Sequence, residues 1–109
     1  MTGSSGASGG GFGGGGEIAC ELLKFEAQIA SPNPTVVATL SVNDELGVVI
    51  ASSSGVQEIQ VKTSSGAVAG GLLANRVQRL RECILHGTRY KARVILINLG
   101  QVRVYVEPV

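Results

Sequence analysis

Aromatic residues, histidine and cysteine are scarce in this sequence, and the scarcity limits its chemistry. The 109 residues include no tryptophan, two tyrosines, two phenylalanines and one histidine, His86. A hydrophobic core must therefore come from Val, Ile, Leu and Ala. No motif pairs His86 with a carboxylate, no two carboxylates have a motif-like spacing, and no phosphate-binding glycine motif precedes a helix. We therefore expect no catalytic site, no bound metal and no cofactor, and we predict that the protein is not an enzyme.

The two cysteines, Cys20 and Cys83, are isolated in the sequence and have no histidine beside them. They match neither a zinc site nor a redox-active C-x-x-C pair. The chain has no apolar run near the roughly 18 residues of a membrane-spanning helix and no secretion signal, so we expect a cytoplasmic protein without membrane association. Cytoplasmic thiols are usually reduced, which predicts two small buried hydrophobes, although a fold that brings the pair together could form a disulfide.

Glycine is abundant at the start of the chain. Residues 1–16 include nine glycines and three serines, and Phe12 is their only large side chain. Such a segment has little apolar surface with which to offset the entropy of ordering. We therefore predict a disordered leader at residues 1–16 and a single domain at residues 17–109.

Alternating apolar and polar residues predict strands at residues 23–29 and 56–62. The uninterrupted apolar run at residues 46–51 has the length of a strand, and we expect it to be covered on both faces. A short strand is expected at residues 67–69, ended by a glycine pair that lets the chain turn toward a helix. Residues 35–40 fit either a strand or one short helical turn.

A helix is predicted at residues 75–86. Asn75 is a favourable N-cap, Gln78 lies where a capping box needs Glu or Gln, and Gly87 is placed to end the helix. Apolar residues recur on one face at the helical period of about 3.6 residues: Leu73, Val77, Leu80 and Ile84. One helix with five or more short strands indicates an α+β fold, a small, mainly antiparallel, partly open β-barrel.

The last part of the chain predicts a β-hairpin around a three-residue turn at residues 98–100. In this register Arg93 faces Tyr105 and Lys91 faces Glu107. One face then carries a set that we name the basic row: Arg89, Lys91, Arg93, Arg103 and Tyr105. The other face carries an apolar set suited to packing on the helix: Tyr90, Ala92, Val94, Leu96, Val102, Val104 and Val106.

The basic row suits single-stranded nucleic acid, because guanidinium groups neutralise phosphates and an aromatic ring stacks on bases. It also fits an acidic protein partner, or a solvated face with a Lys91–Glu107 pair across the strands. Charge is uneven along the chain: residues 17–72 hold two basic against six acidic residues, and residues 73–109 hold seven against two.

We predict a non-enzymatic binding module that takes single-stranded nucleic acid on the basic row. The alternative is a protein-interaction or assembly module of a bacterial multi-component system, with no nucleic acid. In that case, the run at residues 46–51 would allow self-association if it forms an exposed edge strand.

Residues 56–95 resemble a HIRAN domain, a small barrel-like module found fused to helicases and nucleases. The similar stretch runs through residues 58–72, the predicted helix and residues 87–94, and both share the order strand, glycine turn, short strand, Leu/Arg-bearing helix and returning strand. The acidic, Asn-Pro-rich loop usual in that family is replaced here by residues 52–56, with neither Asp nor Pro. The resemblance thus implies a small barrel, and the family's DNA-end binding residues have no counterparts to which they can be assigned. The whole chain also resembles small bacterial proteins with a Gly-rich leader, which implies a bacterial origin.

Overall fold

In the computed structural model, residues 18–109 are described, and the predicted leader at residues 1–16 lies outside this part. The strands are β2 (Phe25–Ala30), β3 (Glu45–Ser53), β4 (Val56–Lys62), β5 (Val68–Leu73), β6 (Tyr90–Asn98) and β7 (Gln101–Pro108). The helical elements are the 3-10 turn η1 (Cys20–Leu22) and the helices α1 (Pro34–Val37) and α2 (Val77–Leu85). The α+β class is confirmed.

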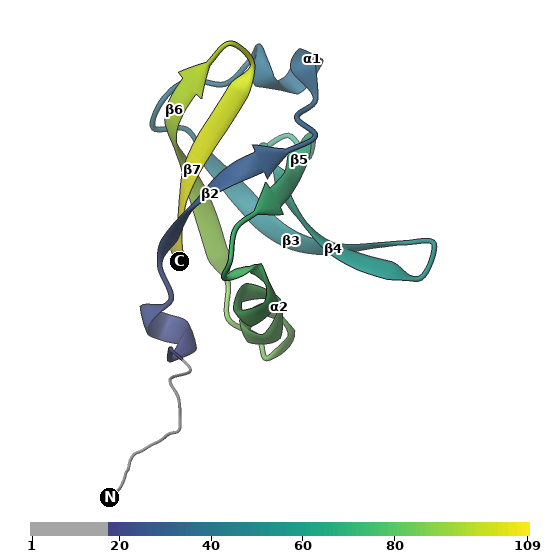
Figure 1. The fold of residues 1–109 in the computed structure, drawn as a ribbon, viewed down its shortest axis with the longest axis vertical. Coiled ribbons are helices and arrows are strands. Elements are labelled where there is room, and N and C mark those ends of the chain that lie inside the picture. Colours follow the sequence, from purple (N-terminus) through teal and green to yellow (C-terminus); the bar gives the residue numbers. More distant parts are fainter. Residues whose placement is uncertain (1–17) are drawn as a thin grey trace, which may run out of the picture.

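The strands form one antiparallel barrel in the order β2-β5-β4-β3-β6-β7 (Figure 1). A single short strand closes the ring: β2 pairs with β7 at its start, where Phe25 faces Val106, and with β5 at its end, where Ile29 faces Leu72. The barrel is therefore closed, where the sequence suggested a partly open one.

The core fills the barrel and is built mainly from Val, Leu, Ile and Ala, as the composition predicts, together with Phe25, Tyr90 and Cys83. Alternate residues of β2, β6 and β7 point inward, in keeping with the period of two along a strand. Helix α2 lies across one end of the barrel and α1 near the opposite end (Figure 1). Leu80 and Cys83 of α2 are fully buried against this core, so the helix closes the end at which it lies.

Helix α2 begins at Val77, and its N-cap is Arg76, which makes no side-chain capping bond. The capping role predicted for Asn75 is therefore wrong, because the chain is still leaving β5 at that point. Leu73 is the last residue of β5 and 65% exposed, so it does not belong to the helix face. Gly87 has a φ of +104° directly after the helix, which confirms the predicted left-handed stop.

The glycine pair at residues 70 and 71 does not end β5, contrary to the prediction. Gly70 has a φ of +153°, and a Cβ there would lie 2.5 Å from Cγ2 of Ile29 and 2.6 Å from the carbonyl oxygen of Ala30. Glycine is thus needed for β5 to approach β2 closely and to cross the irregularity at Val61 and Lys62 of β4.

Two further predictions concern residues 35–40, which fit either a strand or a helical turn, and the run at residues 46–51, which the sequence predicts to be covered on both faces. Residues 34–37 form a short helix, because Pro34 occupies its first turn and the Asn33 side chain accepts a hydrogen bond from the Thr35 N–H at 3.1 Å. Within residues 45–52 of β3, only Leu46 and Val48 are buried, so the run at residues 46–51 is covered on one face and not on both.

Candidate interaction surfaces

The hairpin of β6 and β7 places most of the basic row on one face, although its turn differs from the prediction. The turn has two residues, Leu99 and Gly100, both with positive φ, and Asn98 pairs with Gln101. A bulge at Ile95 adds one residue to β6 and restores the predicted pairs Arg93–Tyr105 and Lys91–Glu107.

The bulge also corrects one prediction on the apolar face. Leu96 lies beyond it and is 52% exposed, while the other six members of the predicted apolar set are buried. Arg103 pairs with Leu96, whereas the predicted three-residue turn would place it opposite Ile95. The extra residue reverses the alternation of β6 from that point to the turn, so Leu96 points outward beside Arg103.

The basic row is held close to acidic side chains from neighbouring strands. Nζ of Lys91 lies 2.9 Å from Oε2 of Glu45 on β3, and Nη1 of Arg103 lies 3.5 Å from Oε1 of Glu26 on β2. The hydrogen bond to Glu45, more than any other contact, raises the pKa of Lys91. The Lys91–Glu107 side-chain pair of the solvated-face interpretation is not formed, because the lysine turns to Glu45 instead.

The third guanidinium of this face also meets a carboxylate. Nε of Arg93 lies 3.9 Å from Oε2 of Glu107, and its Cζ lies 5.8 Å from the centre of the Tyr105 ring. Arg89 is exposed just before β6, and no carboxylate contacts it within residues 18–109. The face therefore combines four cations with three carboxylates, and its net charge is small.

A second surface is the hairpin of β3 and β4, which projects from the barrel (Figure 1). The two strands pair with each other from Gly47–Lys62 to Ser53–Val56. On their outer sides they pair only near the barrel: β3 with β6 as far as Gly47, and β4 with β5 from Gln60 onward. We name residues 50–59 the arm. Within the described part of the chain, both edges of the arm lack a strand partner.

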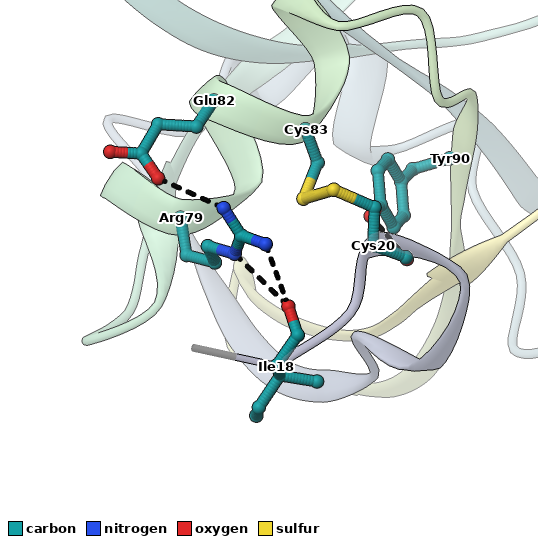
Figure 2. Close-up of a disulfide and its surroundings, with 6 residues drawn as sticks. All are labelled: Ile18, Cys20, Arg79, Glu82, Cys83 and Tyr90. Carbon is teal, nitrogen blue, oxygen red and sulfur yellow. Dashed lines mark hydrogen bonds and ion pairs between the residues drawn. A yellow bond between two sulfur atoms is a disulfide. The ribbon is translucent and has the colours of Figure 1, made fainter. Parts of the chain in front are cut away.

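A disulfide fastens the start of the described chain to α2 (Figure 2). Cys20 and Cys83 are bonded, with their Cα atoms 5.5 Å apart, so the expectation of two reduced thiols is wrong. The Arg79 guanidinium donates to the Ile18 carbonyl at 2.9 and 3.1 Å, and the Tyr90 hydroxyl donates to the Cys20 carbonyl at 2.6 Å. Burial, more than any nearby charge, raises the pKa of Tyr90.

The contacts around the disulfide hold a segment that packs little by itself. No residue of η1 is fully buried, and a single 3-10 turn is not stable alone. The sequence could not predict this pairing, because two isolated cysteines carry no spacing signal and their proximity arises only once β2 and α2 are in place.

His86, the single histidine of the sequence, lies at the C-terminal end of helix α2. The residue is exposed at the C-cap of α2. Its backbone N–H donates to the Glu82 carbonyl at 3.1 Å, and the N–H of the following Gly87 donates to the Ile84 carbonyl at 2.9 Å. Within residues 18–109 no group of three or more His, Cys, Asp or Glu residues is placed to hold a metal ion. None of the helices described in this range is long and apolar enough to cross a membrane.

Comparisons of the chain with models of known protein families, with curated proteins and with solved structures found no match. The HIRAN resemblance therefore stays a prediction. What the structure defines is a six-stranded closed barrel with one main helix, a charge-paired basic row and a projecting arm.

Proposed function

We propose that the protein is a non-enzymatic interaction module that receives an extended polypeptide strand on the open edge of β3. The observation that supports this proposal most directly is the register of β3. It pairs with β6 only over Glu45–Gly47, and from Val48 to Ser53 it pairs with β4 alone. An unpaired edge offers a row of main-chain donors and acceptors, and strand addition uses such a row for binding.

The direction of the main-chain groups can be derived from the ladder. Neighbouring residues of a strand direct their N–H and C=O groups to opposite sides. On the β6 side, the Asp44 carbonyl accepts from the Val94 N–H at 2.8 Å. Residues an even number further along, including Ile50 and Ser52, therefore direct their main-chain groups to the open edge.

The side chains along this edge favour a partner that is also uncharged. Residues 46–55 contain no Asp, Glu, Lys, Arg or Pro, which are the residues that commonly protect edge strands from pairing. β3 also has no register shift against β4 that would twist its edge away. Affinity would then come from main-chain hydrogen bonds and apolar contact rather than from charge.

A synthetic peptide of alternating valine and threonine tests this proposal. It would be titrated into isotopically labelled, monomeric protein while NMR chemical shifts and amide exchange are recorded. We expect shifts confined to residues 48–53 and slower exchange at Ile50 and Ser52. The control is a peptide with proline at every second position, which lacks the required donors. Shifts located elsewhere, or equal shifts with both peptides, would contradict strand addition.

Single-stranded nucleic acid on the basic row is the second candidate. It is supported by the guanidinium of Arg93 over the Tyr105 ring and by Arg89, which no carboxylate of residues 18–109 contacts. The three nearby carboxylates reduce the local charge on which phosphate binding depends, which is why we rank this function second. Labelled oligonucleotides at low salt test it: binding should weaken steeply with added salt, and Arg93→Ala and Tyr105→Ala should each weaken it further. No binding at low salt would eliminate this candidate.

The cytoplasmic location also stays a proposal, and the disulfide weighs against it, because such bonds persist mainly in oxidising compartments. Rapid acid quenching of cells followed by thiol labelling measures the oxidised fraction of Cys20 and Cys83. A predominantly reduced pair would support the cytoplasm, and a predominantly oxidised pair would support an oxidising compartment.

A further inference from the structure

We infer that the strand received by β3 is the β3 strand of a second copy of this chain, paired antiparallel about a twofold axis. This inference rests on the proposed function, because it names the partner of the same open edge. Three properties of the arm lead to it: the symmetry of its hydrogen-bonding groups, the absence of charge along the edge, and its two-stranded construction.

An open edge of this kind is complementary to itself. When one strand pairs antiparallel with its own copy, the same residues occur on both sides of the twofold axis. With Ile50 opposite the partner's Ile50, each residue directs its N–H and C=O toward the other. Val48 then lies opposite the partner's Ser52, and the main-chain groups of Ser52 point to the same open side. The alternation of main-chain groups along this edge therefore permits a self-complementary register centred on Ile50.

Charge along the edge gives the second reason for choosing an identical partner. Like charges directly opposite each other destabilise a strand pair. In a symmetric pair, the residue on the twofold axis lies opposite its own copy and the flanking residues lie opposite other residues of the same strand. Residues 46–55 carry none, so no repulsion arises across the twofold axis. A strongly acidic or basic segment would find no countercharge on this edge, which disfavours a charged foreign strand.

The construction of the arm gives the third reason. Beyond the barrel, β3 and β4 pair only with each other. A two-stranded ribbon is marginal in water, and three or more strands are needed for independent stability. Joining two arms along β3 would create a four-stranded sheet in the order β4-β3-β3-β4. The exposed main-chain groups on the β3 edge of both copies would then be satisfied at the same time.

Sedimentation of the full oxidised chain over a series of concentrations tests the inference. We expect a reversible monomer–dimer equilibrium. Ser52→Lys places a charge on the open edge and should raise the dimer dissociation constant by about tenfold or more. Its matched control is Gln57→Lys, because Gln57 faces Ser52 across the ladder and places the same charge on the opposite strand of the arm. This control should leave the dissociation constant nearly unchanged.

A second variant tests the same edge without adding a charge, so that an unspecific effect of the lysine can be recognised. Ile50→Pro removes a donor from the open side while the neighbouring residues keep the β3–β4 hydrogen bonds, and it should also abolish the dimer. Equal weakening by Ser52→Lys and Gln57→Lys would place the contact elsewhere and overturn the inference.

The inference and the proposed function can fail separately. A chain that is monomeric at every concentration, with rapid exchange at Ile50 and Ser52, overturns the dimer. If that monomer still binds the valine–threonine peptide, strand addition stands and the partner is a different polypeptide. If it binds no peptide, both proposals are wrong.

Discussion

Breaking the bond between Cys20 and Cys83 is expected to lower the free energy of unfolding by about 4 kcal/mol. The bond joins residues separated by 63 positions. In the chain-entropy description, a loop of this length costs the unfolded chain about 14 cal/mol/K, which is about 4 kcal/mol near room temperature. Because a domain of this size is stable by about 5–15 kcal/mol, the loss should be a large fraction of the total.

Urea unfolding measures this loss in three samples: the oxidised chain, the same chain in excess dithiol reductant, and the Cys20→Ala/Cys83→Ala variant. Reduction should lower the midpoint and raise the dependence on urea, because the reduced unfolded chain is less compact. The variant should not respond to the reductant, which makes it the control for other effects of the dithiol.

The structure also predicts which part of the molecule responds first. After reduction, η1 would be held by the hydrogen bonds to the Ile18 and Cys20 carbonyls, while Leu23 stays in the core. Faster amide exchange at η1 with a folded barrel should therefore precede global unfolding. A difference below about 1 kcal/mol between oxidised and reduced chains would refute the loop-entropy reasoning.

Further predictions concern single side chains. Gly70→Ala should destabilise the fold by about 2 kcal/mol or more in urea unfolding, because its Cβ would meet neighbouring atoms at 2.5 and 2.6 Å; a loss no larger than that caused by alanine at the next glycine would contradict this. Tyr90→Phe should cost about 1 kcal/mol by the same assay, because the Cys20 carbonyl loses its donor; unchanged stability would show that water replaces the hydroxyl. The pKa of Lys91 should lie above its ordinary value of 10.5 in an NMR titration, and Glu45→Gln should lower it. Because the folded pKa is raised, this pair stabilises the fold below pH 10.5 and the contribution disappears as pH rises through the raised pKa; an unchanged pKa in the variant would exclude Glu45 as the cause.

The hairpin of β6 and β7 shows which features the sequence could predict and which it could not. Alternation identified both strands and the pairs that bring Arg93 opposite Tyr105, because a buried face fixes which side each residue takes. It could not locate the bulge at Ile95, since an extra residue in one strand leaves both alternating patterns intact on either side. The assumed three-residue turn and the real bulge happen to shift the register by the same amount.

Long-range features were beyond local patterns. The role of Gly70 depends on how closely β2 approaches β5. The disulfide depends on η1 lying next to α2, which brings Cys20 close to Cys83. The sequence offered an exposed edge strand at residues 46–51 only as an alternative, because such a run looks alike whether a strand has one neighbour or two. Only the length of each ladder separates the paired start of β3 from its open end.

Closure of the barrel decides how the charges of the chain should be interpreted. Along the sequence, the acidic residues precede the basic ones, which suggests a molecule with one acidic and one basic part. In the ring, however, β6 lies beside β3 and β7 beside β2. Each strand of the basic hairpin therefore adjoins a strand from the acidic half, and Glu45 and Glu26 reach Lys91 and Arg103. Beyond Gly47, however, β3 extends past its ladder with β6 and presents an uncharged open edge. The charge pairing in the ring therefore weakens the case for nucleic acid on the basic row, and the uncharged extension of β3 favours strand pairing there.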